Sequence, residues 1–175
     1  AEISWLKKSI FEMDKRKSID ILSCGYKKFG DEQDVVNHPQ NSNIIKLMLC
    51  YSSPICHPGS IWRNEKIKDF RFSTTTAAED HDFWCNISEA GLKISNLNEI
   101  LINYRVRKNS LTQKKKNLIR WAVKKRGLVF FLKNYKSIKK CSFSELFKNS
   151  RKYSKLRWFP SFIFLFIAKV LSFFF

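Results

Sequence analysis

The stretch that decides the fold reads TAAEDHDFWCNISEAG over residues 76–91, and ILINYRV follows it over residues 100–106. Phe83, Trp84 and Ile87 form an apolar stripe at helical spacing, and Gly91 stands where a left-handed helix stop is expected. In residues 100–106 every second residue is apolar, which is typical of a half-buried strand. A helix followed directly by a strand indicates an α/β layer architecture.

The same stretch predicts where its helix begins and which strand face carries charge. Thr76 and Glu79 have the spacing of a capping box, which predicts a helix over residues 76–90. The alternation of the strand places Arg105 and Arg107 on the face opposite its apolar residues.

Upstream, the pattern predicts further alternation of helices and strands. Ser4 is placed to cap a first helix, and the apolar residues of that helix fall on one face. Those residues are Leu6, Ile10 and Met13. The remaining expectations are a strand over residues 19–26, a polar loop over 30–41, a short helix near 44–48, an irregular loop over 51–60 and a short strand over 61–63.

The chain has 175 residues and a formal net charge of +18, and this charge is unevenly distributed. Residues 1–107 carry fifteen Lys and Arg against fourteen Asp and Glu, whereas residues 108–157 carry seventeen against one. The length can hold one ordinary domain. We therefore predict an α/β part over residues 1–113, a basic helical region over 114–157 and an apolar segment over 158–175, with an anionic partner for the basic region.

The apolar segment, residues 158–175, is mostly Phe, Ile and Leu, interrupted by Pro160 and Lys169. A membrane-spanning helix needs roughly 20 apolar residues, so this segment is borderline. A basic run before an aromatic-rich apolar run predicts attachment to an anionic membrane on its cytoplasmic face. The alternative is a buried terminal helix. The side chains expected at the membrane are Lys114, Lys115, Lys116, Trp121, Trp158 and Phe159.

The five cysteines are odd in number and include no C-x-x-C pair. Without a secretory signal at the start, this pattern predicts reduced cytosolic thiols and no zinc site. The chain does not begin with Met and opens on a helical pattern, from which an upstream segment is expected.

Asp80 is the first candidate for chemistry, because it stands in the first turn of the predicted helix. A carboxylate on a rigid element can act as a general base, taking the proton of an acceptor hydroxyl as its oxygen attacks a sugar's anomeric carbon. The structural alternative is that the acid complements the helix dipole, which is worth about 0.3–1 kcal/mol. Capping alone explains Glu79.

Three further candidates each have a structural alternative. Arg105 is suited to clamp a diphosphate through bidentate hydrogen bonds, or it is a solvated residue at a strand end. His57, in a proline-flanked loop, would contact a hydroxylated acceptor, or it is incidental to the loop. His81 and Asp82 form a weak candidate for a metal-binding pair.

Four segments in order carry a family resemblance. They read PICHPGSIWR over residues 54–63, AEDHDFW over 78–84, GLKI over 91–94 and ILINYR over 100–105. This set resembles the second half of family-two glycosyltransferases, which are inverting enzymes with the GT-A fold, common in bacterial surface-polysaccharide synthesis. The resemblance covers residues 1–112. The expected fold class is therefore α/β, a partial GT-A (Rossmann-like) domain followed by a basic, helical, membrane-associating tail.

The resemblance implies a role for each matching side chain. Asp80 matches the catalytic base, and Glu79 would shape the acceptor side. Arg105 and the residues after it match a segment that closes over donor and acceptor, and Tyr104 is expected among the residues that bind donor or acceptor. The last matching pair, His57 and Arg63, belongs to a His-Pro…Arg segment near the cleft.

The resemblance also implies a divalent cation, Mg²⁺ or Mn²⁺, held against the donor diphosphate by an Asp-x-Asp motif. The opening residues 1–4, with Glu2 as the remaining acid, look like the end of that motif. The nucleotide-binding half of the family domain is expected upstream of this chain.

The resulting hypothesis is transfer of a sugar from a nucleotide-diphosphate donor to a lipid-linked or lipooligosaccharide acceptor at the cytoplasmic face of a bacterial inner membrane. A nucleic-acid-binding module is the alternative from another class, because aromatic residues are interleaved with the basic ones. The Phe-rich sequence that follows the basic region argues against this alternative, because it would gain nothing from contact with nucleic acid. A truncated remnant without activity is the third possibility.

Overall fold

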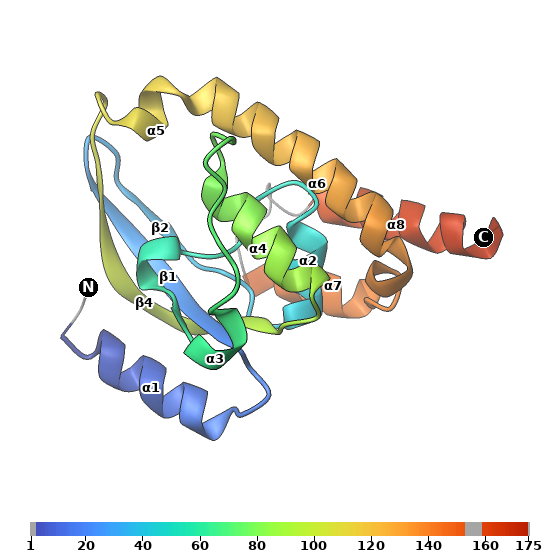
Figure 1. The fold of residues 1–175 in the computed structure, drawn as a ribbon, viewed down its shortest axis with the longest axis horizontal. Coiled ribbons are helices and arrows are strands. Elements are labelled where there is room, and N and C mark those ends of the chain that lie inside the picture. The colour runs from blue at the N-terminus through green and yellow to red at the C-terminus, as the bar shows by residue number, and fades with distance from the viewer. Residues whose placement is uncertain (1–2, 153–158, 175) are drawn as a thin grey trace.

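The computed structural model describes residues 3–152 and 159–174, and it has a mixed α/β architecture built on a four-stranded mixed sheet (Figure 1). β1 (Ile21–Gly30) pairs with all three other strands. β4 (Ile94–Val106) runs parallel to it along its whole length, whereas β2 (Asp34–Val36) and β3 (Ile61–Trp62) pair antiparallel with its two ends. The prediction of an α/β fold is confirmed.

The parallel pair of β1 and β4 brings two strand ends to one place. The register starts with Ile21 opposite Ile94 and ends with Gly30 opposite Val106. It shifts between Ser23 and Tyr26, where β4 uses more residues than β1. Both strands therefore finish together, and side chains at their carboxyl ends face the same edge of the sheet.

The helices pack on both faces of this sheet. Their bounds are α1 Trp5–Lys15, α2 Ser42–Met48, the 3-10 helix η1 His57–Gly59, α3 Asn64–Ile67, α4 Glu79–Glu89, α5 Leu111–Lys114, α6 Lys116–Ile138, α7 Phe143–Lys152 and α8 Phe159–Phe174. α1 lies at the blue end of the molecule, away from α6 and α8 (Figure 1).

The alternation along β1 separates two apolar cores. Ile21 belongs to a large core that it shares with side chains of α2, α4, α6, α7 and α8. Leu22 and Cys24 belong to a smaller core, to which α1 contributes Met13. The two cores lie on opposite faces because successive strand side chains point to opposite sides of a sheet. The basic region thus packs against the α/β part through a shared core.

The predicted capping residues are not the ones used. α4 begins at Glu79, and its N-cap is Ala78, without a side-chain cap. The Thr76 hydroxyl accepts a hydrogen bond from the backbone N–H of Ala78 at 3.2 Å, so the predicted capping box is wrong. Ser4 precedes α1 without capping it. The helix stop at Gly91 is confirmed, because this residue has a φ of +84°.

Two strands are longer than predicted and one was missed. β1 continues to Gly30 and β4 starts at Ile94. The expected polar loop contains β2, which pairs with residues 26–28 of β1. Gly30, with a φ of +94°, ends β1 ahead of the turn into β2.

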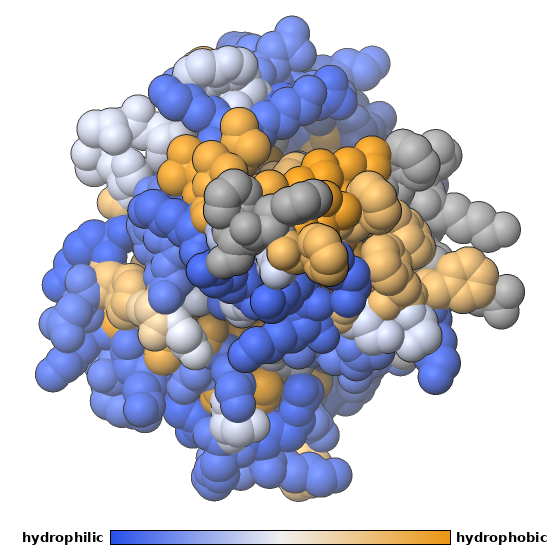
Figure 2. Space-filling view, turned by 90° about the vertical axis from the view of Figure 1, so that its right-hand side faces the viewer, coloured by the Kyte–Doolittle hydropathy of each residue, from blue (hydrophilic) through white to orange (hydrophobic). Residues whose placement is uncertain are grey.

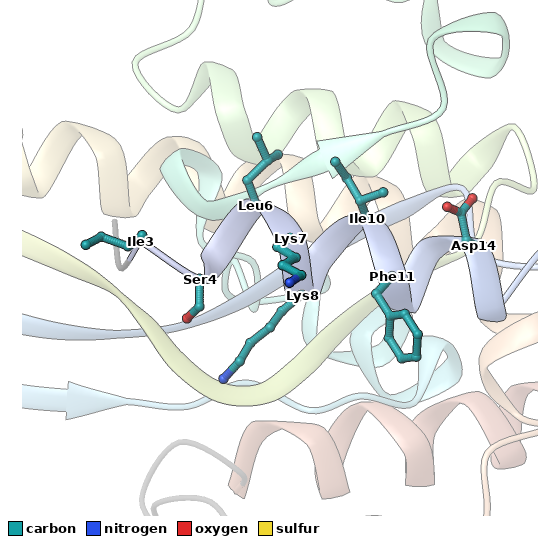
Figure 3. Close-up of a pocket in the computed structure, with 8 residues that line it drawn as sticks. All are labelled: Ile3, Ser4, Leu6, Lys7, Lys8, Ile10, Phe11 and Asp14. Atoms are coloured by element: carbon teal, nitrogen blue, oxygen red, sulfur yellow. The ribbon is translucent and has the colours of Figure 1, made fainter.

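The outer face of α1 is apolar and exposed. Leu6 and Ile10, expected on one face with Met13, are half exposed, and only Met13 enters the core. Leu6 and Ile10 help to line an open pocket of about 900 Å³. In Figure 3 these two side chains point to one side of α1, whereas Phe11 points to the other.

Among the described residues, no helix combines the length and apolar character needed to cross a membrane. α8 has 16 residues. Leu165 and Ala168 are fully buried in the large core, whereas Phe166 and Phe173 are exposed. The buried-helix alternative therefore describes one face of α8 only.

Candidate functional site

A pocket of about 440 Å³ lies at the joint carboxyl ends of β1 and β4. β1 contributes Tyr26 and Lys28, and β4 contributes Tyr104 and Arg105. The other walls come from η1, from the first turn of α4, from residues 53–56 and from the segment around α5. Carboxyl ends of parallel strands are common ligand sites in α/β proteins. Four of the side chains singled out in the sequence, His57, Asp80, Tyr104 and Arg105, line this one pocket.

Asp80 is partly exposed at the start of α4. Its Oδ1 accepts a hydrogen bond from the backbone N–H of His81 at 2.7 Å, which restrains the carboxylate. The helix dipole favours a negative charge at this place. A restrained, partly hydrated carboxylate that lines a pocket is able to accept a proton from a bound hydroxyl group.

Aromatic contacts position His57 and Tyr104. The His57 ring stacks on Phe72 with 5.0 Å between centroids, and the edge of Trp84 meets it at 5.8 Å. Phe72 in turn stacks on Phe83 of α4 at 4.1 Å. Through Phe72 and Trp84, α4 therefore holds the His57 ring in place. The Tyr104 ring lies 5.5 Å from that of Tyr26 on the neighbouring strand.

The pocket is also lined by three polar side chains that the sequence motifs do not indicate: Lys28, Glu32 and Gln113. Lys28 Nζ lies 3.0 Å from a carboxylate oxygen of Glu32, and the Gln113 amide donates to the other oxygen at 3.3 Å. The hydrogen bond and charge of Lys28 lower the pKa of Glu32. The lysine's place at the end of a β-strand is the one signal that could have indicated it. Ser53, which also lines the pocket, has a buried Oγ that finds no hydrogen-bond partner among residues 3–152 and 159–174.

Two predicted site residues lie outside this pocket's lining. The Arg63 guanidinium donates to the backbone carbonyls of Ile19 at 3.1 Å and of Met13 at 2.6 Å, so it joins α1 to the start of β1. Glu79 is exposed at the first position of α4.

The candidate pair of His81 and Asp82 is divided between other contacts. His81 is fully buried, and its Nε2 lies 3.0 Å from the carbonyl oxygen of Leu49. Burial lowers its pKa. Asp82 Oδ1 accepts from Arg126 Nε at 2.6 Å. Both side chains therefore serve the packing of α4.

Within the described ranges, no group of three His, Cys, Asp or Glu side chains is placed to hold a metal ion. The carboxylates that line the pocket are Glu32 and Asp80. These residues do not make a site for the Mg²⁺ or Mn²⁺ that the resemblance implies. Glu2, the predicted remnant of a metal motif, lies outside the described residues.

The five cysteine thiols are all buried and unpaired in disulfides. Burial raises the pKa of Cys24 and Cys141 to about 11, and that of Cys56 and Cys85 to about 12. Burial also raises the pKa of Cys50. None of them supplies a thiolate near neutral pH.

The side chains predicted at a membrane are exposed where the structure describes them. Lys114, Lys115 and Lys116 lie at the junction of α5 and α6, and Trp121 is exposed further along α6. Lys125 Nζ lies 5.0 Å from the centre of the Trp121 ring. Trp158 and the side chain of Phe159 lie outside the described residues.

No protein-family model, no curated protein and no solved structure matches this chain. A functional assignment therefore depends on the chemistry of the pocket and on the order of the sequence motifs.

Proposed function

We propose that this chain is the acceptor-side part of an inverting GT-A glycosyltransferase. One observation carries the proposal: Asp80, His57, Tyr104 and Arg105 come from three separate elements and line the same pocket. The pocket lies at the carboxyl ends of two parallel strands, where this class of fold needs its site.

In this proposal Asp80 is the general base. It removes the proton of an acceptor hydroxyl while that oxygen forms a bond to the anomeric carbon of the donor sugar. The bond between that carbon and the diphosphate oxygen breaks on the opposite face, and the nucleoside diphosphate leaves. The sugar is transferred with inversion.

One cation in the pocket suits the diphosphate leaving group. Arg105 offers a planar guanidinium that binds phosphate oxygens in a bidentate manner. The other cation that lines the pocket, Lys28, is paired with Glu32 and Asp34. His57, held by Phe72 and Trp84, would contact the acceptor. The nucleotide and any Mg²⁺ or Mn²⁺ would be bound by residues outside those described here.

Transfer assays test the role of Asp80. The full open reading frame that contains this chain is expressed, and membranes from these cells are incubated with labelled UDP- and GDP-sugars and a bacterial lipid extract. The amount of labelled glycolipid is measured. Asp80→Asn should lower the initial rate about a thousandfold, within the range for loss of a general base. Asp69→Asn, at an exposed site outside the pocket, is the control with the same change in charge. Normal turnover by Asp80→Asn would remove Asp80 from the role of base.

The proposal includes attachment to an anionic membrane through the outer face of α8. Large apolar side chains recur there at helical spacing and are exposed: Ile163, Phe166, Ile167, Val170 and Phe173. Phe143 and Phe147 of α7 are also exposed. Figure 2 shows hydrophobic residues gathered on this side of the molecule, with hydrophilic residues around them. α6 and α8 pack together, and α6 carries exposed lysines that attract anionic headgroups.

A further inference from the structure

A second pocket lies beside the proposed acceptor pocket, between residues 73–77 and α6. Its volume is about 400 Å³. Ala77 and Asp82 line it, whereas Asp80 lines the first pocket. Residues two apart on a helix are separated by about 200° around its axis. The two pockets therefore open on opposite flanks of the first turn of α4.

One wall of the second pocket is an apolar face of α6. Leu118, Trp121, Ala122 and Val129 recur at helical spacing on this face. The exposed fractions of Leu118, Trp121 and Val129 are 52%, 59% and 41%. Exposed apolar groups that adjoin on one helix face are typical of a surface that binds a ligand, a membrane or another protein.

The other components of the pocket are hydroxyl groups and a cation. Ser73, Thr75 and Thr76 line the loop side. The Thr76 oxygen accepts from a backbone N–H, which leaves its own O–H available to donate. Lys125 Nζ stands over the Trp121 ring at 5.0 Å and has no acidic partner within the part of the chain that is described.

The remaining charges in the pocket neutralise each other. Arg126 donates to Asp82 at 2.6 Å, to Asn86 at 2.8 Å and to Glu89 at 2.9 Å. Asp82 therefore leaves little unbalanced negative charge, and Lys125 makes the net charge of the pocket positive. Lysines along α5 and α6 add to the positive field.

We propose that this second pocket binds the phosphate headgroup of an anionic amphiphile. Lys125 and the loop hydroxyls would hold the phosphate oxygens, and the α6 face would cover the first carbons of the attached chain. A sugar stacked on Trp121 fits less well, because the lysine ammonium covers one face of that ring. The ligand is either a membrane phospholipid or an isoprenoid phosphate of the kind that carries saccharides. This binding does not depend on the proposed transfer reaction.

Calorimetric titration of the full chain tests the site with soluble ligands. Dihexanoylphosphatidylglycerol represents the phospholipid, geranyl phosphate the isoprenoid carrier, inorganic phosphate the bare anion and octyl glucoside an uncharged amphiphile. At least one amphiphilic phosphate should bind more tightly than both inorganic phosphate and octyl glucoside. The tighter of the two identifies the source.

Paired variants locate the binding. Lys125→Gln should weaken the amphiphilic phosphate about tenfold, since a charge-assisted hydrogen bond is lost. Lys124→Gln makes the same change on the same helix outside the pocket and should leave binding unchanged. Asp80→Asn should also bind normally, which separates this site from the proposed reaction. Equal losses in the two lysine variants would overturn the proposal. So would the absence of binding, or inorganic phosphate or octyl glucoside binding as tightly as the amphiphiles.

Discussion

Arg126 is the side chain that ties the basic helix to the proposed active site. Its guanidinium bonds to three side chains on α4, at Asp82, Asn86 and Glu89. The carboxylates have exposed fractions of 23% and 22%, so their charges need compensation, which Arg126 gives to both and Lys133 adds to Glu89 at 3.8 Å. A planar guanidinium can fill three acceptors at once, which an ammonium group cannot do in the same geometry. The bridge fixes α4, and with it the start of the helix where Asp80 stands.

Removing this guanidinium should destabilise the protein. We expect Arg126→Ala to lower the free energy of unfolding by about 2–3 kcal/mol, because it removes the cation from the partly buried Asp82 and leaves Glu89 with Lys133 at 3.8 Å. The midpoint of urea unfolding measures the effect. Lys124→Ala removes a neighbouring exposed cation and should cost less than about 0.5 kcal/mol. If both variants unfold at the same urea concentration, the bridge does not contribute to stability.

At the scale of elements, α6 approaches the end of α2 closely enough to exclude a side chain. Gly127 faces the backbone that follows α2, and a Cβ there would lie 2.2 Å from the carbonyl oxygen of Cys50. The obstacle is backbone, which cannot move aside as a flexible side chain can. This contact explains a glycine in the middle of a 23-residue helix.

Gly127→Ala should therefore reverse the usual sign of this substitution. In an exposed helix the change stabilises by up to about 1 kcal/mol. Here we expect a loss of about 2 kcal/mol or more, because the two elements must separate. Thermal unfolding followed by circular dichroism measures it. A rise in melting temperature would show that α6 packs differently.

The succession of α4 and β4 was predictable because local patterns specify both. The stripe of Phe83 and Trp84, the stop at Gly91 and the alternation after residue 100 all lie within the segments that form these elements. β2 was missed because three residues in a polar loop carry little periodicity of their own. Its pairing with Tyr26 on β1 provides what the local sequence lacks.

The site shows the same division between local and non-local information. His57, Asp80 and Arg105 were singled out from motifs, and they line one pocket. Lys28 and Gln113 meet Glu32 only because the register of β1 and β4 brings α5 to the end of β1. No sequence pattern records that register.

Considered as a whole, the molecule has exposed apolar side chains at several places, among them α1, α6 and α8. Of these helices, α1 and α8 lie far apart (Figure 1). α8 packs against a helix rich in lysine, whereas the α1 pocket carries Lys7 and Lys8 with Asp14, and Lys8 is paired with Glu99. Binding to an anionic bilayer is stronger when a surface combines apolar area with positive charge. We therefore expect α8, and not α1, to govern lipid binding.

Vesicle flotation distinguishes the two places. Phe166→Ser with Val170→Ser should weaken binding to vesicles containing phosphatidylglycerol by about tenfold or more, given the apolar area removed. Leu6→Ser with Phe11→Ser is the matched change on α1 and should have little effect. Tight, steeply salt-dependent binding to DNA without affinity for lipid would instead support the nucleic-acid alternative.

The enclosure of every cysteine has a practical consequence. Because the thiols are buried and protonated, peroxide and glutathione disulfide do not react with them in the folded protein. As long as the chain stays closed, a shift from reducing to oxidising surroundings leaves its covalent connectivity untouched.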